Sequence, residues 1–165
     1  MLSFFKKKEE KSTVNNILAA DGDIVAVADG NMIPIEDVND EVFAQKMMGD
    51  GVAFELKGDV VYAPCNGVLE VAFPTGHAYG ITMKDGTGLL VHVGINTVDA
   101  NGDGFKSYVE QGQQVKAGDP LVKLDMKKLS AKYDMTTMLI VTEPGDKAPE
   151  FIQYGDVAMG QKVNM

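Results

Sequence analysis

The sequence predicts an all-β protein, an antiparallel β-sandwich or flattened barrel with duplicated half-motifs and a few short helical turns. Short apolar segments recur along the chain from residue 17 onward. Turn sequences rich in Gly and Asp, such as DGD, KGD and KDG, separate these segments. Helical spacing of apolar residues is confined to brief stretches. Many short strands at close spacing, with turn signals between them, are typical of β-sandwiches and barrels.

The expected elements follow one another in short runs. The predicted strands are ILAA (17–20), DIVAVA (23–28), GVAFEL (51–56), DVVYAP (59–64), GVLEVAF (67–73), GITM (80–83), GLLVHVGI (88–95), PLVKLD (120–125) and MLIVTEP (138–144). The predicted helical turns are EDVNDEVFAQKM (36–47), GFKSYVEQG (104–112) and KKLSAKYD (127–134).

Two pairs of segments form a weak internal repeat. GDIVAVADGNMI (22–33) resembles GDVVYAPCNGVL (58–69), and VKAGDPL (115–121) shares its glycine spacing with VAMGQKV (157–163). No linker interrupts the chain after residue 16. We therefore expect one domain over residues 17–165, preceded by a flexible, lysine-rich leader over residues 1–16.

Composition and charge limit the classes of protein. The 165 residues carry a net charge of −9, which argues against a nucleic-acid-binding protein and favours a basic protein partner. Cys65 is the only cysteine, so no intrachain disulfide can form. We expect a cytoplasmic protein. Leu2, Phe4 and Phe5 beside three lysines could also bring the leader transiently to an anionic membrane.

The only two histidines, His77 and His92, each lie in a distinctive setting. His92 is inside an apolar strand, where alternation places it on one face with Leu90 and Gly94. The same alternation directs the intervening residues Leu89, Val91 and Val93 into the core. His77 follows a Pro-Thr-Gly turn, and an extended chain there would put it on one face with Thr75 and Tyr79.

A neutral imidazole has one bare nitrogen, which is a nucleophile, and one N–H. If the two rings meet, one could carry a phosphoryl group while the other stabilises its charge. Two imidazoles could instead supply two ligands of a metal site, and each could also be an ordinary core or surface histidine. The residues by themselves leave these alternatives open.

Two longer motifs contain these histidines. GTGLLVHVGINTV (86–98) and APCNGVLEVAFPTGHAYGI (63–81) together resemble the signatures of the glucose-type IIA proteins of the bacterial sugar phosphotransferase system. The resemblance covers roughly residues 24–157. It implies an antiparallel β-sandwich with two histidines at the centre of a shallow apolar depression.

The resemblance also implies roles for single residues. His77 would accept the phosphoryl group, and His92 would steady that group and take part in its onward transfer. Thr75 would hydrogen-bond within the pair, and the Gly94 carbonyl would fix a histidine tautomer. The residues expected to bind partners are Asp40, Phe43, Phe73, Leu90 and Asn96. Asn96 stands where these proteins often have Asp, so one rim carboxylate is lost.

The function implied is that of a phosphocarrier. It would take a phosphoryl group from the histidine-containing phosphocarrier protein and pass it to the IIB domain of a sugar permease with IIB and IIC parts. The alternative is a regulatory protein that inhibits metabolic enzymes or transporters according to its phosphorylation state. No cofactor is expected, although His77 and His92 would bind zinc weakly if a partner added a carboxylate.

Two further motifs compete with this interpretation. Residues 99–110 match the pattern of an EF-hand calcium loop, but a strand rather than a helix leads into them. GQQVKAGDPLVKLDMKKL (112–129) resembles biotinyl carrier domains, with Lys127 in the place of the modified lysine. The Met expected after that lysine is replaced by Lys128. We therefore regard a biotinyl-type carrier as less favoured than a phosphocarrier.

Overall fold

The computed structural model describes residues 17–165, and the predicted leader lies outside the described residues. The strands are β1 (Gly30–Pro34), β2 (Asp50–Leu56), β3 (Val60–Tyr62), β4 (Gly67–Ala72), β5 (Ala78–Thr82), β6 (Gly88–Val93), β7 (Phe105–Ser107), β8 (Gln114–Val115), β9 (Pro120–Leu124), β10 (Thr137–Glu143) and β11 (Gly155–Val157). The helical turns are η1 (Ile35–Asp37), α2 (Glu41–Ala44), η2 (Thr97–Ala100) and α3 (Met126–Ser130).

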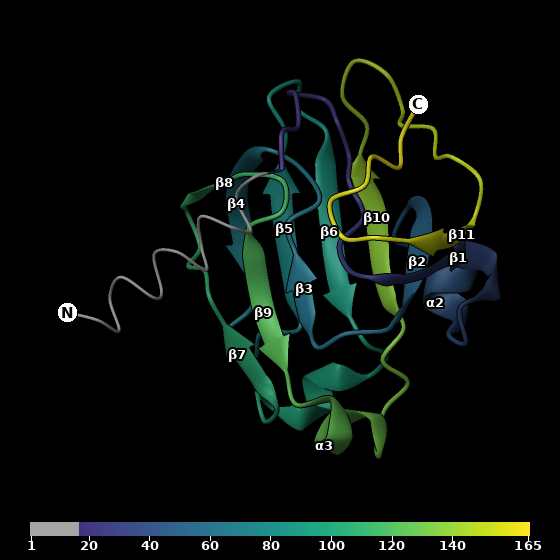
Figure 1. The fold of residues 1–165 in the computed structure, drawn as a ribbon, viewed down its shortest axis with the longest axis vertical. Coiled ribbons are helices and arrows are strands. Elements are labelled where there is room, and N and C mark those ends of the chain that lie inside the picture. The colour runs from purple at the N-terminus through teal and green to yellow at the C-terminus, as the bar shows by residue number, and fades with distance from the viewer. Residues whose placement is uncertain (1–16) are drawn as a thin grey trace.

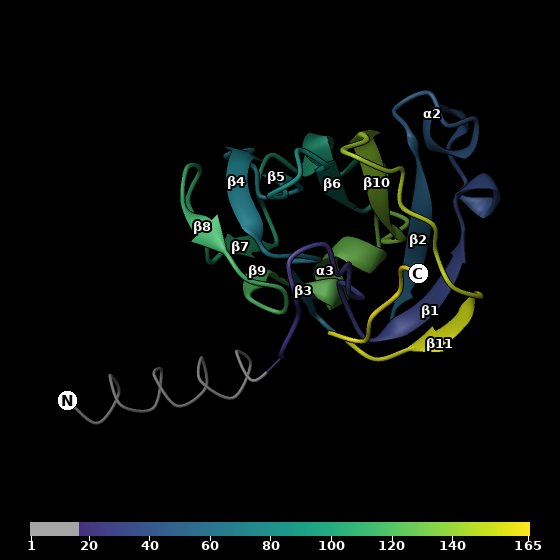
Figure 2. The same ribbon diagram turned by 90° about the horizontal axis from the view of Figure 1, so that it is seen from above.

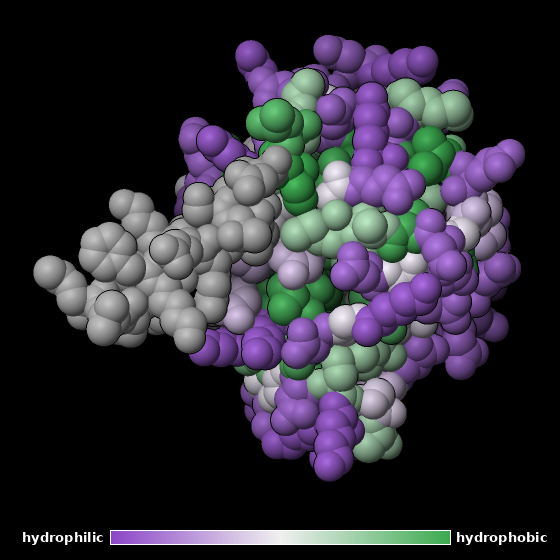
Figure 3. All heavy atoms as spheres, viewed as in Figure 1, coloured by the Kyte–Doolittle hydropathy of each residue, from purple (hydrophilic) through white to green (hydrophobic). Residues whose placement is uncertain are grey.

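The strands form two antiparallel sheets, which confirms the predicted fold class. One sheet has eight strands in the order β11-β1-β2-β10-β6-β5-β4-β8, and the other has three in the order β3-β9-β7. The larger sheet curves around, and the smaller sheet closes its open side (Figures 1 and 2). On the face viewed in Figure 3, apolar side chains lie in separate groups between charged ones.

Several predicted boundaries differ from the structure. The segment 17–20 forms no strand, and Val25 makes only an isolated bridge to Lys162 within 23–28. The prediction of a helical turn over 104–112 is wrong, because Phe105–Ser107 pairs with β9 as strand β7. The helical turns predicted over 36–47 and 127–134 are confirmed in shorter form. β1 matches the second strand expected in the repeat unit GDIVAVADGNMI, whereas the sequence does not predict β8 and β11.

The duplicated half-motifs make matching backbone hydrogen bonds. Ala26 bonds through both its N–H and its C=O to the turn at Gly160–Gln161, at 2.8 and 3.0 Å. Ala63 bonds in the same way to the turn at Gly118–Asp119, at 2.8 and 2.9 Å. The structural match pairs Ala26 with Ala63, one residue beyond the Tyr62 that the sequence alignment suggests.

Both turn glycines adopt positive φ angles, +89° at Gly118 and +83° at Gly160. A Cβ added at either glycine would collide with the side chain of Ile17. Ile17 therefore occupies a notch between the two equivalent turns.

Alternation along β6 separates two buried clusters. Leu89, Val91 and Val93 point into the main core between the sheets, as predicted. The other face of the larger sheet carries a second cluster, formed where η1 and α2 cover β2 and β10. Its members are Ile35, Val38, Phe43, Ala53, Ile95, Met138 and Ile140. His92 lies on this second face, so its ring is outside the main core. Within residues 17–165, no helix is long and apolar enough to cross the lipid bilayer.

The central strand β10 gives a test of how the core stabilises the fold. Leu139 on β10 is fully buried, whereas Leu18 is 99% exposed. We expect Leu139→Ala to lower the free energy of unfolding by about 2–5 kcal/mol, because it removes buried methyl groups and leaves a cavity. Chemical denaturation measures the loss. The matched control Leu18→Ala is expected to stay within about 0.5 kcal/mol of the parent protein. An equal loss in both variants would contradict the assigned core.

Candidate active site

His92 is held at the end of a central strand. Strand pairing places it opposite Ala78 on β5 and Met138 on β10. Its ring packs against Phe43 of α2, with a centroid separation of 4.9 Å and an interplanar angle of 54°. Asp40 caps α2 by accepting a hydrogen bond from the Val42 N–H at 2.9 Å. The capped helix α2 therefore holds Phe43 in contact with the His92 imidazole.

His77 lies in the turn that precedes β5 rather than in a strand. Gly76 has a φ of +76°, so Thr75, His77 and Tyr79 do not share one face of an extended chain. Tyr79 is buried in the main core instead. The turn brings the Thr75 hydroxyl to 2.5 Å from His77 Nδ1, so the expected hydrogen bond is present.

The two imidazoles meet. Their ring centroids are 5.3 Å apart, and the rings are nearly perpendicular at 83°. Phe73 adds a third ring, edge-on to His77 at a centroid distance of 5.2 Å. The sequence-based expectation that the histidines lie side by side therefore holds in the structure.

The hydrogen bonds at the two Nδ1 atoms are different in kind. His92 Nδ1 lies 2.9 Å from the Gly94 carbonyl, which can only accept. His92 therefore carries its proton on Nδ1, and in the neutral ring the bare nitrogen is Nε2. His77 Nδ1 instead faces a hydroxyl, which can donate or accept. If the hydroxyl of Thr75 donates, the proton of neutral His77 is on Nε2.

The rings also differ in exposure. His77 is only 3% exposed, whereas His92 is partly exposed. Burial lowers the pKa of both imidazoles below the ordinary 6.5, because it disfavours the charged ring. For His92, the Gly94 carbonyl and the Asp40 carboxylate partly oppose this lowering of the pKa, and His77 adds to it. Burial therefore favours the neutral form of both rings.

The residues expected to bind partners are not equally placed to do so. Phe73 is 45% exposed, and Asn96 is exposed in a left-handed conformation with φ +60°. Asp40 is half-buried at the N-terminus of α2. Phe43 is buried against the His92 ring, and Leu90 is partly buried against the second cluster, so both are less accessible to a partner than Phe73.

Sequence reasoning missed two exposed apolar residues at this site. Val42 on α2 neighbours Phe43 and is 43% exposed, and Val98 on η2 is 52% exposed. Val98 is the last residue of the motif GTGLLVHVGINTV, so the motif itself could have marked it as a residue of the site. Together with Phe73, which lies edge-on to His77, they are the exposed apolar residues of the segments that carry the site, and we refer to Val42, Phe73 and Val98 as the apolar rim.

The competing motifs do not assemble into sites. Asp103 in the EF-hand-like segment forms an ion pair with Lys128 at 2.7 Å. Lys127 lies in the helix α3. Within residues 17–165, no three His, Cys, Asp or Glu side chains are grouped closely enough to hold a metal ion. A zinc site that uses the two histidines would therefore depend on a partner's ligands.

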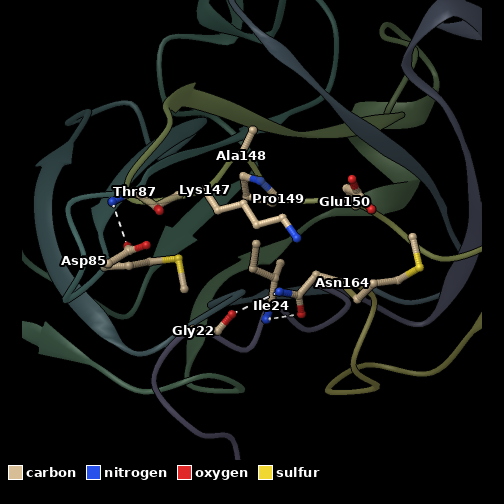
Figure 4. A pocket seen from close by; sticks show the side chains of 11 residues that line it. Gly22, Ile24, Asp85, Thr87, Lys147, Ala148, Pro149, Glu150 and Asn164 are labelled. Atoms are coloured by element: carbon tan, nitrogen blue, oxygen red, sulfur yellow. Dashed lines mark hydrogen bonds between the residues drawn. The ribbon is translucent and has the colours of Figure 1, made fainter.

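A separate pocket of about 190 Å³ lies at the opposite end of the β5–β6 hairpin from the histidines. Lys147 extends across it, with Asp85 and Glu150 on either side (Figure 4). Hydrogen bonds from the Thr87 hydroxyl and from the Thr87 N–H, the latter 3.0 Å long, lower the pKa of the Asp85 carboxylate. The pocket contains neither histidine, so it is distinct from the candidate active site.

The fold and the paired imidazoles together match one class of proteins. The family model described as "phosphoenolpyruvate-dependent sugar phosphotransferase system, EIIA 1" matches residues 22–146. The chain belongs to this family and is an EIIA phosphocarrier component of a sugar phosphotransferase system.

Individual relatives agree with this assignment. The "PTS system glucose-specific EIIA component" of Mycoplasma capricolum is 42% identical over 141 residues, covering 85% of this chain and 92% of the relative. The solved structure titled "glucose permease IIA from Mycoplasma capricolum" superposes with a TM-score of 0.83 at 41% identity, covering 86% and 93% of the two chains. The "PTS system glucose-specific EIICBA component" of Staphylococcus carnosus is 38% identical over 155 residues, covering 93% of this chain but only 23% of that protein.

The environments of the two rings predict their titration. We expect both histidines to titrate with midpoints below 6.5, because burial favours the neutral rings. The Asp40→Asn variant should move the His92 midpoint further down, since a carboxylate that favours the charged ring is lost. Asn is an equally good helix N-cap, so α2 should persist. Two-dimensional ¹⁵N NMR of the ring nitrogens measures both values. A rise of the His92 midpoint in the variant would contradict the assigned electrostatics.

Proposed function

We propose that His92 accepts the phosphoryl group at Nε2 and that His77 stabilises it, the reverse of the roles expected from the sequence resemblance. The observation that carries this proposal is the hydrogen bond from His92 Nδ1 to the Gly94 carbonyl, 2.9 Å long. Because a carbonyl cannot donate, it holds His92 in the tautomer whose Nε2 lone pair is free. His92 is also more exposed than His77, which supports its role as the residue that a phosphoryl donor reaches.

In the transfer step, the Nε2 lone pair of His92 forms a bond to phosphorus. The bond between phosphorus and the donor's histidine nitrogen breaks, and that nitrogen keeps the electron pair. The His92 ring gains positive charge as its new bond forms. The Gly94 carbonyl stabilises this charge through the Nδ1–H, because a hydrogen bond to the charged form is the stronger one. The neutral ring of His92 at pH 7 keeps the lone pair available.

His77 would stabilise the phosphoryl group on His92 through a hydrogen bond. Thr75 donating to Nδ1 would leave an N–H at Nε2 of His77, able to bond to a phosphoryl oxygen carried on the neighbouring ring. The centroid distance of 5.3 Å is short enough for the two rings to share one small group. A donor N–H that is already oriented needs little reorganisation during transfer.

We propose that the donor is the histidine-containing phosphocarrier protein and that the acceptor is the IIB domain of a IIB/IIC sugar permease. The apolar rim around His92 supports docking of a complementary apolar surface, and the net charge of −9 supports steering of a basic donor. The staphylococcal relatives named EIICBA support a partnership with B and C components. Their names, and that of the mycoplasmal relative, favour glucose as the sugar transported.

A second function at the same surface is regulatory binding of metabolic enzymes or transporters. The exposed apolar rim supports it, because a phosphoryl group on His92 would add a charge of about −1.5 to −2 beside that rim. Partners that bind the apolar surface would then prefer the unphosphorylated protein.

The two assignments of the histidines predict opposite outcomes for matched variants. We expect His92→Gln to take up no phosphoryl group, because the nucleophilic nitrogen is gone. His77→Gln should still be phosphorylated on His92 but pass the group on about 10²–10⁴ times more slowly. Each variant would be incubated with phosphoenolpyruvate and the upstream phosphotransferase proteins, and the label located by mass spectrometry under alkaline conditions.

The parent protein and circular dichroism of both variants provide the controls. Uptake by His92→Gln together with its loss in His77→Gln would restore the assignment expected from the resemblance.

Asn96 gives a test of electrostatic docking. Its side chain is exposed, and Asp tolerates a left-handed backbone as Asn does, so Asn96→Asp should leave the turn intact. We expect the added carboxylate to raise affinity for a basic donor about two- to fivefold, as one exposed ion pair would. Initial rates of phosphoryl uptake at varied donor concentration measure this. The gain should vanish at high ionic strength, and a gain that salt does not reduce would contradict the electrostatic explanation.

A further inference from the structure

We propose that Thr97 is a positioning residue that holds both histidines through the turn Val93–Thr97, an inference that rests on the phosphocarrier function proposed above. Thr97 touches neither imidazole. It is fully buried, and it begins η2 directly after the strand that carries His92. Its role follows from what its hydroxyl and its methyl group each contact.

The hydroxyl of Thr97 fixes the start of the turn. Its Oγ1 donates to the Val93 carbonyl at 2.5 Å. The N–H of Val93 in turn donates to the His77 carbonyl at 2.7 Å. The peptide groups on both sides of Val93 are thus tied, one to Thr97 and the other to His77. A shift of Val93 would therefore move the backbone that carries His77.

The methyl group of Thr97 closes the space around Gly94. A Cβ at Gly94 would lie 2.5 Å from Thr97 Cγ2 and 3.0 Å from Met135 Sδ, so the two side chains leave room only for glycine. Gly94 has a φ of +79°, and its carbonyl accepts from His92 Nδ1. The methyl group therefore helps to explain why glycine occupies this turn, whereas the hydroxyl holds the Val93 end of the turn, directly before the Gly94 carbonyl.

One more backbone hydrogen bond holds this turn, and its acceptor belongs to the segment before β10. The Ile95 N–H donates to the Asp134 carbonyl at 2.8 Å, which anchors the middle of the turn to the chain before β10. This bond does not orient the Val93 or Gly94 carbonyls. Besides the His92 ring, which bonds to the Gly94 carbonyl, the Thr97 hydroxyl is the side-chain group among the described residues that bonds to the backbone of this turn.

The test replaces the hydroxyl while keeping the shape. Thr97→Val leaves the Val93 carbonyl without its partner, and the turn is expected to loosen. We expect the ¹⁵N spectrum of the His92 ring to change from one Nδ1–H tautomer to a mixture. Phosphoryl uptake should fall about 10- to 100-fold, as small misplacements of reacting groups do. Thr97→Ser retains the hydroxyl and should restore both the tautomer and most of the rate.

A matched control separates this effect from general destabilisation. Thr87 is another buried threonine, which bonds to Asp85 at the far end of the same hairpin. Thr87→Val should lower the thermal midpoint without changing the His92 tautomer. If Thr97→Val fails to fold, Thr97→Cys, whose thiol is a weak donor, should give an intermediate tautomer mixture.

The outcomes separate this inference from the proposed function. The ring spectra require no phosphoryl donor, so they test Thr97 directly. A pure Nδ1–H tautomer and a parental rate in Thr97→Val would overturn the positioning role, as would a folded Thr97→Ser that rescues neither property. Failure of the parent protein to take up any phosphoryl group would instead overturn the proposed function.

Discussion

The arrangement at the site depends on the hydrogen bond between His92 Nδ1 and the Gly94 carbonyl, 2.9 Å long. The ring N–H of His92 and the carbonyl of Gly94 are only two residues apart, so the strand must end and the chain must turn back between them. Only glycine suits the turn, because φ is +79° and the space beside the Cα is filled. One backbone carbonyl therefore selects a tautomer, and with it the nitrogen that can act as a nucleophile.

The rest of the sandwich gives this hydrogen bond a rigid setting. His92 stands on a central strand between β5 and β10, and the inward residues of β6 are buried in the main core. Phe43, presented by the capped helix α2, covers one side of the ring, and His77 covers another. The same packing removes water, which lowers the pKa of each imidazole and keeps the rings neutral. The packing that holds the two rings in place therefore also favours their neutral, nucleophilic form.

The sequence predicted the features that follow from periodicity or motif. The alternation in GLLVHVGI was enough to put Leu89, Val91 and Val93 in the core and His92 on the other face. It could not predict the division of roles between the histidines, which depends on whether each Nδ1 meets a carbonyl or a hydroxyl in three dimensions. The pattern over 104–112 predicts a helical turn where the structure has strand β7, because Phe105–Ser107 is too short to show a period and is extended by its pairing with β9. Likewise, Phe43 is apolar whether it lies on a rim or beneath a ring, and only packing distinguishes the two.

The notch that holds Ile17 has a mechanical consequence. Its two walls, the turns at Gly118 and Gly160, belong to the side of the molecule where β3 and β9 lie, whereas α2 lies on the other side (Figure 2). Ile17 thus anchors the described chain on the back of the sandwich. A substitution at Ile17 would therefore act on the two equivalent turns, and the imidazoles beside α2 should keep their arrangement.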